Sequence, residues 1–220
     1  MTPQPVEPSP WRFDPTQWSM LSDCVAVGAD LEPSTVIAAY RHGAFPMPQD
    51  GALCWWSPAL RGVLRPADLR VSRSLRKAVQ RFTITYDTDF AAVIDACADP
   101  VRPGAWIDGD IRDAYVRLHE LGWAHSVETR DDEGNLVGGL YGIQVGRLFA
   151  GESMFHVARD ASKVALVALV GLQAGGLIDV QWSTNHLASL GVIAIDRWDY
   201  LRRLPGLVDQ PPPAWPNGAP

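Results

Sequence analysis

The feature that most constrains the fold is a run of strand-like segments in the second half of the chain. Residues 124–130, 136–145 and 148–155 have strand patterns, and the turn signals DDEGN and VGR join them. A strongly apolar helix follows over 162–174, and LIDVQW at 177–182 has the pattern of another strand. Antiparallel strands that lead into a strand, helix and strand unit predict an α/β (α+β) domain with a mixed, mostly antiparallel sheet.

The sequence predicts a small N-terminal domain over 17–65 and a larger domain over 66–204. In the small domain the pattern predicts a helix over 33–42, followed by a strand and a loop. The larger domain begins with a helix, a strand and two more helices, predicted at 72–81, 82–87, 89–99 and 110–121. The Pro-rich segments 1–16 and 205–220 are predicted to be flexible tails.

Composition supports a folded domain and excludes several classes of protein. Hydrophobic residues make up 47% and charged residues 20% of the 220 residues, which allows a sizeable core. No window approaches the ~18 consecutive apolar residues of a membrane span, and the N-terminus lacks a secretory signal. We expect a cytoplasmic protein without a membrane partner, and a monomer.

Cysteine and histidine spacing gives no sign of a metal site. Cys24, Cys54 and Cys97 form no CxxC pair, which argues against a disulfide framework and against structural zinc. No HxxxH spacing is present, and no histidine spacing suggests a metal site. His186 could orient the polar side chains of the preceding strand, although a structural histidine is the simpler interpretation.

The net charge is -6, but the charges are unevenly distributed. From Arg61 to Arg81 there are seven basic residues and one acid, Asp68, so this segment carries +6 and the remainder -12. Within the predicted helix, Arg73, Lys77 and Arg81 share one face. A basic segment on an acidic body suits a protein that contacts phosphate groups at one place and repels them elsewhere.

Nine tryptophans are an unusually large number for this length. Trp55 and Trp56 are adjacent in a predicted strand, so their side chains point to opposite faces. Both could pack between the domains, or one indole could stack on a base or sugar. Trp106 lies in the loop PGAWIDGD between two predicted helices and is the better candidate for such stacking.

Three polar side chains lie in apolar strand segments. Glu152 is in FAGESMF, and Asp179 and Gln181 are two residues apart in LIDVQW, which places both on one strand face. A carboxylate on such a strand needs hydrogen-bond partners, and groups of this kind often mark functional sites. A solvated strand face, or a buried acid satisfied by arginine or backbone groups, would explain the same pattern.

The predicted element order is similar to that of GNAT acyltransferases. An enzyme of that type needs a glycine-rich loop between a strand and a helix to hold the pyrophosphate of CoA. The corresponding segment, HVARDA at 156–161, has no glycine and carries Asp160. The sequence therefore disfavours CoA binding.

Motifs in a fixed order carry a closer resemblance. Between residues 27 and 204 the chain contains DLEPSTVIAAYRHGAFP, LCWWSP, GAWI, AYVRLHELGWAHSVE, LVGGLYGIQVGRLFAGESMF, ASKVAL and LIDVQWSTNHLASLG. In combination these segments closely resemble the leucyl/phenylalanyl-tRNA-protein transferase family. The resemblance implies a small N-terminal domain followed by a GNAT-like acyltransferase domain.

The resemblance also implies an activity. Members transfer Leu, Phe or Met from aminoacyl-tRNA to the α-amine of proteins that begin with Arg or Lys. The products would enter the bacterial N-degron (N-end rule) degradation route. The family uses neither metal nor CoA, so no cofactor is expected beyond the aminoacyl-tRNA co-substrate.

Site residues carry over position by position. Asp179, Gln181 and Glu152 match the catalytic residues of the family. The resemblance implies that the apolar pocket for the aminoacyl side chain includes Leu140, Phe149, Met154, Leu166, Leu169 and Ile178.

The matches extend to residues that would bind the tRNA. Trp106 and Tyr115 match positions near the terminal adenosine, and Tyr40 matches one at the domain interface. Arg73 and Lys77 match the phosphate contacts of the basic helix. The charge count and the resemblance therefore indicate the same face.

The implied reaction is aminolysis of an activated ester, in which positioning matters more than a strong base. The attacking α-amine has a pKa of about 7.7 to 8.0 and is partly neutral at cytoplasmic pH. In this hypothesis Gln181, held by Asp179, accepts a hydrogen bond from the attacking amine. Glu152 would bind the α-amine of the aminoacyl group.

The chain departs from the family pattern at a few positions. Met47 stands where the family often has Trp, and Thr184 and Asn185 vary the stretch after the catalytic strand. Leu140 and Leu169 occupy pocket positions where the family also uses Met or Phe. The two pocket positions bear on the ranking of Leu, Phe and Met as substrates, and Met47 bears on a stacking contact that the family makes there.

Two other functions fit part of the sequence. A GNAT-type acyl-CoA N-acetyltransferase would suit the element order but not the glycine-free loop. A noncatalytic RNA-binding module would suit the basic helix and the tryptophans, but it would leave Glu152, Asp179 and Gln181 unexplained.

Overall fold

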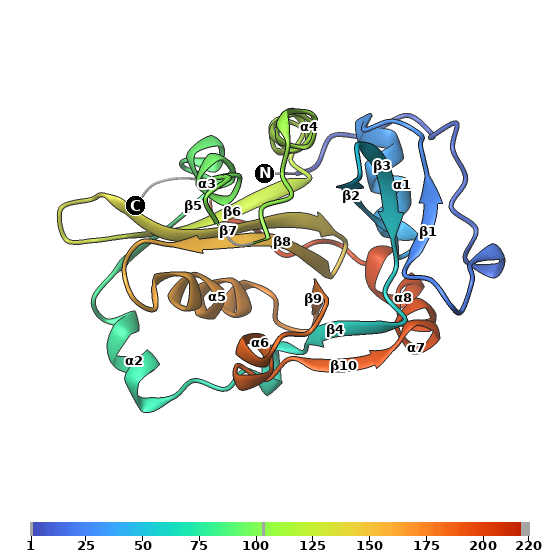
Figure 1. The fold of residues 1–220 in the computed structure, drawn as a ribbon. Helices are drawn as coiled ribbons and strands as arrows, with labels where there is room; N and C mark the ends of the chain where they lie inside the picture. The colour runs from blue at the N-terminus through green and yellow to red at the C-terminus, as the bar shows by residue number, and fades with distance from the viewer. Residues whose placement is uncertain (1, 103, 217–220) are drawn as a thin grey trace.

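A seven-stranded sheet in the order β10-β4-β9-β8-β7-β6-β5 runs through the larger part of the molecule (Figure 1). The computed structural model describes residues 2–102 and 104–216. All neighbouring strands pair antiparallel except β8 and β9, so the prediction of a mixed, mostly antiparallel sheet is confirmed. The strands are β4 (Leu60–Leu64), β5 (Thr83–Tyr86), β6 (Ala124–Arg130), β7 (Leu136–Val145), β8 (Leu148–His156), β9 (Leu177–Gln181) and β10 (Ile193–Asp196).

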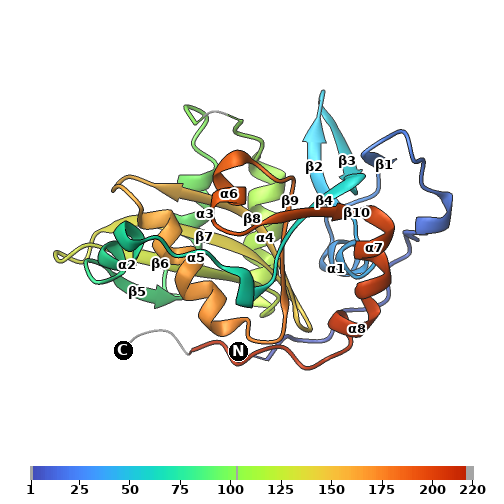
Figure 2. The ribbon, with the colours of Figure 1, turned by 90° about the horizontal axis from the view of Figure 1, so that it is seen from below.

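Helices cover both faces of this sheet (Figures 1 and 2). On one face lie α3 (Phe90–Cys97) and α4 (Gly109–Glu120), and on the other lies α5 (Ala161–Leu172). α2 (Arg73–Val79) packs beside α5, and the short α6 (Asn185–Ser189) follows β9. These bounds agree with the predicted ones to within one or two residues, except for α6, which the sequence analysis does not predict.

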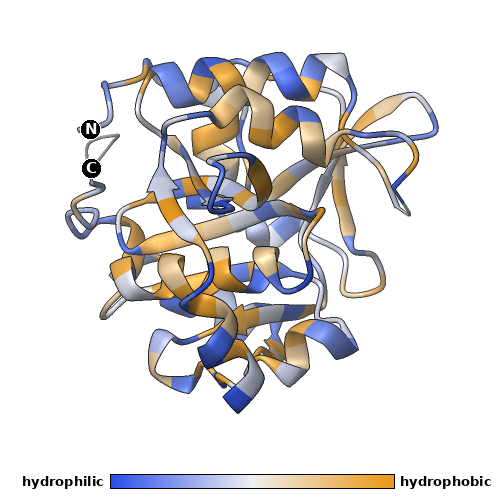
Figure 3. Ribbon diagram, turned by 90° about the vertical axis from the view of Figure 1, so that its left-hand side faces the viewer, coloured by the Kyte–Doolittle hydropathy of each residue, from blue (hydrophilic) through white to orange (hydrophobic). Residues whose placement is uncertain are grey.

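Each face of the sheet has its own hydrophobic core. Tyr141, Ile143 and Phe90 belong to the core beneath α3 and α4, and Phe149 and Leu166 belong to the core beneath α5. Figure 3 shows hydrophobic residues along the central strands, with hydrophilic residues at the lower edge where α2 lies. Among the described residues, no helix is long and apolar enough to cross a membrane.

A smaller, three-stranded sheet in the order β1-β3-β2 forms the N-terminal domain, at the right of Figure 1. Its strands are β1 (Cys24–Val27), β2 (Phe45–Gln49) and β3 (Ala52–Trp56), and α1 (Pro33–Arg41) packs beside β2. Near the junction of the two sheets lie α7 (Arg197–Arg203) and α8 (Pro205–Val208). The short 3-10 helices η1 and η2 span Pro15–Gln17 and Pro66–Asp68.

The two adjacent tryptophans of β3 have different surroundings. Trp55 is fully buried against Phe13, with ring centroids 4.8 Å apart, and its indole N–H donates to the Gly28 carbonyl. Trp56 is half-buried and packs edge-on against Trp182. Trp56 therefore packs against the larger domain, as the simpler alternative predicts, whereas Trp55 packs inside the N-terminal domain and not between the domains.

The structure corrects the predicted domain boundary at residue 65. β4 pairs with β9 and β10 and therefore belongs to the large sheet, although the prediction assigns it to the N-terminal domain. Residues 57–59, which include Pro58, separate β3 from β4. Because proline cannot donate to a ladder, the chain leaves one sheet here and enters the other.

The structure also corrects the two predicted flexible tails over residues 2–16 and 205–216, while residues 1 and 217–220 lie outside the described residues. The Gln4 N–H donates to the Leu121 carbonyl, and Phe13 is buried in the core. At the other end, Trp215 is only 5% exposed and its ring stacks on His125 at 4.2 Å between centroids. Aromatic side chains bury large areas, so one of them anchors each Pro-rich segment.

Candidate active site

The parallel strands β8 and β9 separate part-way along their length, and the candidate site lies where they part. Their pairing ends at Ala150 and Asp179, although β8 continues to His156. A register shift against β7 leaves Glu152 as an extra residue with no partner in the ladder. On β9, Gln181 has a φ of 63°, so the strand turns sharply there. Side chains from both strands can therefore meet in the gap.

The turn at the end of β9 depends on a glycine in the neighbouring strand. Gly62 of β4 pairs with Gln181, and a Cβ on Gly62 would lie 2.9 Å from the backbone nitrogen of Ser183. Only glycine allows the chain to cross this closely. The sequence prediction assumes a regular strand, in which Asp179 and Gln181 point to the same face. Because the backbone turns at Gln181, this rule does not set the direction of the Gln181 side chain.

Glu152 accepts hydrogen bonds from three elements of the fold. The Gln181 side-chain amide donates to Glu152 Oε1 at 3.0 Å. The Tyr40 hydroxyl, from α1, donates to the same oxygen at 2.7 Å, and the Tyr115 hydroxyl, from α4, lies 3.2 Å from Oε2. The carboxyl group of Glu152 is thus buried but well supplied with donors.

The oxygens around Glu152 form a closed ring. The Tyr40 and Tyr115 hydroxyls lie 2.5 Å apart, so the ring has three oxygen contacts but only two tyrosine protons. A proton on Glu152 would fill the third contact. Burial raises the pKa of Glu152 to about 7, and the charge of Asp179 adds to the rise, while hydrogen bonds from Tyr40 and Gln181 oppose it. Glu152 can therefore change its charge near neutral pH.

Asp179 is held by four donors. Arg61 donates from Nε to Oδ1 at 2.8 Å and from Nη2 to Oδ2 at 2.6 Å. The Tyr200 hydroxyl donates to Oδ2 at 2.7 Å, and the Gln181 backbone N–H donates to Oδ1 at 2.9 Å. Asp179 thus fixes the backbone of Gln181, while the Gln181 side chain is held by Glu152. Within the described residues, no donor reaches Gln181 Oε1.

Arg61 and Tyr200 are site residues that no sequence pattern identifies. The sequence places Arg61 in the basic segment, but this residue is only 1% exposed and lies between the rings of Phe45 and Tyr200. Burial opposes the charge of Arg61, but Asp179 outweighs it and raises the pKa of the guanidinium. The apolar pattern LRGVL around Arg61 is the available signal that this arginine points inward.

A cavity of about 250 Å³ opens beneath the split between the strands, and Glu152 and Gln181 stand at its polar edge. Phe149 forms one wall of the cavity, and Gly142 leaves room for its ring, because a Cβ on residue 142 would lie 2.6 Å from Cε1 of Phe149. The size, near the lower limit of roughly 300 Å³ for small-molecule sites, suits a single amino-acid side chain. The structure brings all six predicted pocket residues together around it: Leu140, Phe149, Met154, Leu166, Leu169 and Ile178.

The predicted adenosine contacts lie in different surroundings. Trp106 is half-buried and lines a hollow that shares Ser153 and Met154 with the cavity. Tyr40 and Tyr115 are fully buried and serve Glu152. In this conformation their rings have no surface open to a nucleotide, which differs from the expectation for Tyr115.

The predicted phosphate contacts lie on α2. Arg73 and Lys77 are exposed there, whereas Leu75 and Ala78 face the core. Arg81 follows the end of the helix at Val79, so the predicted one-faced row of three cations is limited to Arg73 and Lys77. The helix therefore presents basic side chains to solvent on the same side of the sheet as α5.

Two family models match this chain. The model described as leucyl/phenylalanyl-tRNA protein transferase matches residues 63–205, and the model of the N-terminal domain of that transferase matches residues 29–59. The chain belongs to the leucyl/phenylalanyl-tRNA-protein transferase family. This membership makes it an aminoacyltransferase, and it decides against the acetyltransferase and the noncatalytic RNA-binding module.

Relatives in this transferase family cover most of the chain. The leucyl/phenylalanyl-tRNA-protein transferase of Pseudomonas entomophila is 53% identical over 195 residues, 85% of this chain and 86% of that protein. That of Aromatoleum aromaticum is 55% identical over 181 residues, 79% of this chain and 76% of that protein. The structure of L-PGS from Bacillus licheniformis covers 72% of this chain and 55% of its own, with a TM-score of 0.36 and 10% identity. That likeness is too distant to indicate a shared function.

Proposed function

We propose that this transferase moves leucine, phenylalanine or methionine from aminoacyl-tRNA to the α-amine of proteins that begin with Arg or Lys. One observation carries the proposal, which is an apolar cavity with Glu152 and Gln181 at its edge in a chain of this family. The products would be marked for N-degron degradation. In this proposal the enzyme works in the cytoplasm as a monomer, with aminoacyl-tRNA as co-substrate and no further cofactor.

The proposed reaction forms a peptide bond and breaks an ester bond. The neutral α-amine of the acceptor attacks the carbonyl carbon of the aminoacyl ester, and the ribose oxygen leaves as a hydroxyl with the proton that the amine gives up. Gln181 Oε1 accepts a hydrogen bond from the attacking amine, because its own N–H is engaged by Glu152. A carboxamide is a very poor base, so its role is to orient the amine rather than to keep the proton.

Glu152 would bind the α-ammonium group of the donor amino acid. An ionised Glu152 is stabilised by that cation in a buried setting, where a charge interaction is stronger than in water. The aminoacyl side chain then extends into the cavity toward Leu166 and Leu169. A difference of one methylene is worth only about 1 to 3 kcal/mol in such a pocket, so several unbranched or γ-branched side chains would be accepted.

A transfer assay tests this function. Labelled Leu, Phe and Met on tRNA would be offered with two peptides that differ only in an N-terminal Arg or Gly. Transfer to the Arg peptide alone is expected, and Gln181→Ala should lower kcat while tRNA affinity stays unchanged. Gln17→Ala, which removes an exposed glutamine, serves as the control. Failure of the folded protein to use any charged tRNA would refute the proposal.

A further inference from the structure

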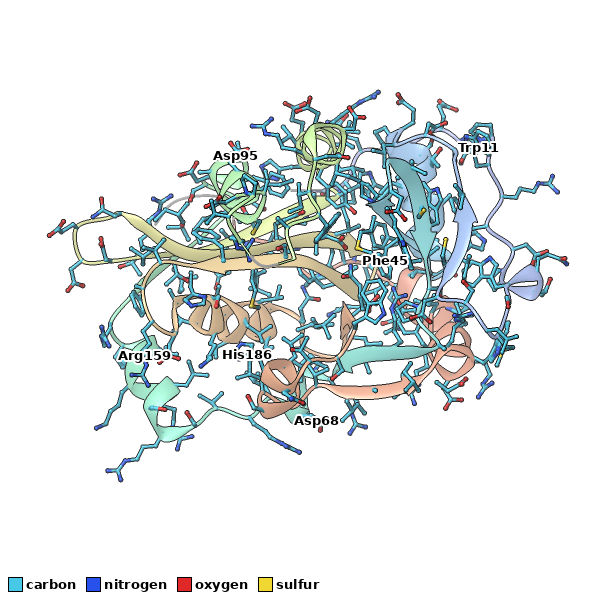
Figure 4. The ribbon with its side chains drawn as sticks, in the orientation of Figure 1. Trp11, Phe45, Asp68, Asp95, Arg159 and His186 are labelled. Carbon is cyan, nitrogen blue, oxygen red and sulfur yellow. The ribbon has the colours of Figure 1, made fainter. Side chains whose placement is uncertain are left out.

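A second hollow, of about 500 Å³, adjoins the mouth of the apolar cavity. It lies among the end of β8, the first turn of α5 and α6, and His186 of α6 lines both spaces. Figure 4 shows Arg159 and His186 on the lower side of the molecule, beside α5. We call this hollow the α5 groove, and its lining residues are His156, Val157, Arg159, Asp160, Ser162, Lys163 and His186.

The α5 groove has an excess of positive charge. Arg159 and Lys163 are opposed by one acid among the described lining residues, Asp160, and two histidines and Ser162 complete the polar surface. The pKa of His186 is lowered by burial and by the nearby charges of Lys163 and His156. The positive charges in the groove repel one another. A bound anion would reduce this repulsion.

Asp160 lies beside both permanent cations of the groove and offsets part of their charge. It begins α5 in the left-handed region, with a φ of 67°, and it does not cap the helix with its side chain. Instead, Lys163 Nζ donates to Asp160 Oδ1 at 2.8 Å, and Arg159 Nε lies 3.7 Å from Oδ2. The Arg159 side chain remains 93% exposed, so its guanidinium is free to take an external ligand.

The groove also lies close to two parts of the proposed tRNA site, the basic helix α2 and the apolar cavity. α2, with Arg73 and Lys77 exposed, packs beside α5, and Figures 1 and 2 both show the two helices adjacent. The ester that reacts must sit at the mouth of the cavity, by Glu152 and Gln181, and His186 lines the same cavity. A strand of RNA that reaches this mouth from α2 would pass over the α5 groove.

We propose that the α5 groove binds the phosphodiester groups of the last nucleotides at the 3′ end of the tRNA, with Arg159 and Lys163 as the main contacts. This inference rests on the proposed function, because that function supplies the ligand. Phosphate contacts of this kind position a nucleic acid without reading its sequence. The groove would thus set the register of the single-stranded end, while α2 holds the helical part.

Donors of graded length provide the test. Phenylalanyl-adenosine carries no phosphate, phenylalanyl-CpA carries one phosphodiester and phenylalanyl-CpCpA carries two. Arg159→Ala and Lys163→Ala should raise KM several-fold for CpA, CpCpA and whole tRNA, and leave the adenosine donor unchanged. For tRNA, the slope of log affinity against log salt should fall by about 0.7 for each phosphate that the variant no longer neutralises. Arg203→Ala removes an exposed arginine of α7 as the control.

A variant with the opposite effect strengthens the test. Asp160→Asn removes the single acid of the groove but tolerates the left-handed backbone, so it should lower KM for the phosphate-bearing donors. A purely structural role would not improve binding. An equal loss with phenylalanyl-adenosine, or no change with any donor, would overturn the proposal.

Direct binding separates this proposal from the proposed function. A CpCpA oligonucleotide should bind more weakly to Arg159→Ala than to the original protein, and an oligonucleotide with uncharged methylphosphonate linkages should bind equally weakly to both. Free CoA should not compete, because the glycine-free loop offers no pyrophosphate cradle. Charge-dependent binding of CpCpA without any transfer would support the phosphate site in the groove and refute the proposed transfer function. Competition by CoA would instead assign the groove to a nucleotide cofactor.

Discussion

Arg61 and Asp179 form a buried ion pair whose two hydrogen bonds, 2.8 and 2.6 Å long, join β4 to β9. The same carboxylate accepts the backbone N–H of Gln181, so the ion pair fixes the residue that faces Glu152. Arg61 therefore acts on the site through the backbone of β9. Its position 118 residues away in the sequence makes this a tertiary constraint that no local pattern contains.

Removal of Arg61 should destabilise the protein strongly. Arg61→Met leaves Asp179 as an uncompensated buried charge, and a broken buried pair costs about 3 to 5 kcal/mol. Urea denaturation at neutral pH measures this change in unfolding free energy, and the transfer assay should show a lower kcat. An Arg61→Met protein as stable as the original would show that the pair does not hold the site.

The double variant Arg61→Met with Asp179→Leu separates stability from activity. Replacement of both partners by apolar side chains removes the unpaired charge, so much of the stability should return. The Gln181 backbone would still lack its acceptor, so transfer should remain impaired. Recovery of transfer together with stability would contradict this assignment.

Activity should depend on the charge of Glu152. Its pKa of about 7 means that the carboxylate forms as pH rises through neutrality. The affinity for the donor should therefore increase with pH until the donor's own α-ammonium group loses its proton. The acceptor amine titrates at about 7.7 to 8.0 and also affects the rate, so the KM of the donor is the measurement of choice. In Glu152→Gln the pH dependence of this KM should disappear, and Glu133→Gln, on an exposed turn, should retain it.

Glu152 should also make stability fall with rising pH. The folded-state pKa, about 7, exceeds the ordinary value of 4.5, so between these values the folded protein binds more protons than the unfolded chain. Stability therefore decreases from about pH 4.5 to about pH 7. Denaturant unfolding across this pH range measures the change. The unfolding free energy of the original protein should decrease, and that of Glu152→Gln should not. Parallel curves would mean that Glu152 does not titrate there.

Much of the large sheet could be predicted because its signals are local. The strands at 124–130 and 136–145 carry strand patterns and clear turn signals, and the structure has them with the same bounds. Asp179 and Gln181 could be recognised as unusual polar residues, but the left-handed turn at Gln181 depends on Gly62 in another strand. Arg61 resembles a surface charge because the sequence does not reveal its partner.

The surroundings of Glu152 are hidden from the sequence for the same reason. Its hydroxyl donors come from α1 and α4, 112 and 37 residues away in sequence. The resemblance places Tyr40 at the domain interface, and the structure has it there, bonded to Glu152 of the larger domain. The resemblance does not reveal that Tyr40 and Tyr115 both surround a carboxyl group. Non-local hydrogen bonds of this kind depend on how the two domains pack, which residue spacing does not encode.

Trp215 should stabilise both the fold and the cavity wall. It stacks on His125 and lies 5.8 Å from the ring of Phe149, which lines the cavity. Trp215→Ala should lower the unfolding free energy by about 3 to 5 kcal/mol and change the ratio of Phe to Leu transfer, because Phe149 loses its support. Trp215→Phe keeps an aromatic ring, so both the unfolding free energy and the transfer ratio should change much less. A lower melting temperature with an unchanged ratio would limit Trp215 to stability.

The exposed cations of α2 should contribute affinity without selecting among tRNAs. Arg73→Ala with Lys77→Ala should weaken binding of every tRNA by a similar factor and flatten its salt dependence, because fewer counterions are released. At saturating tRNA, kcat should be unchanged, since neither residue lines the cavity. Arg12→Ala with Arg203→Ala removes the same charge from exposed positions elsewhere. Equal flattening in that control would attribute the effect to net charge and remove α2 from the interface.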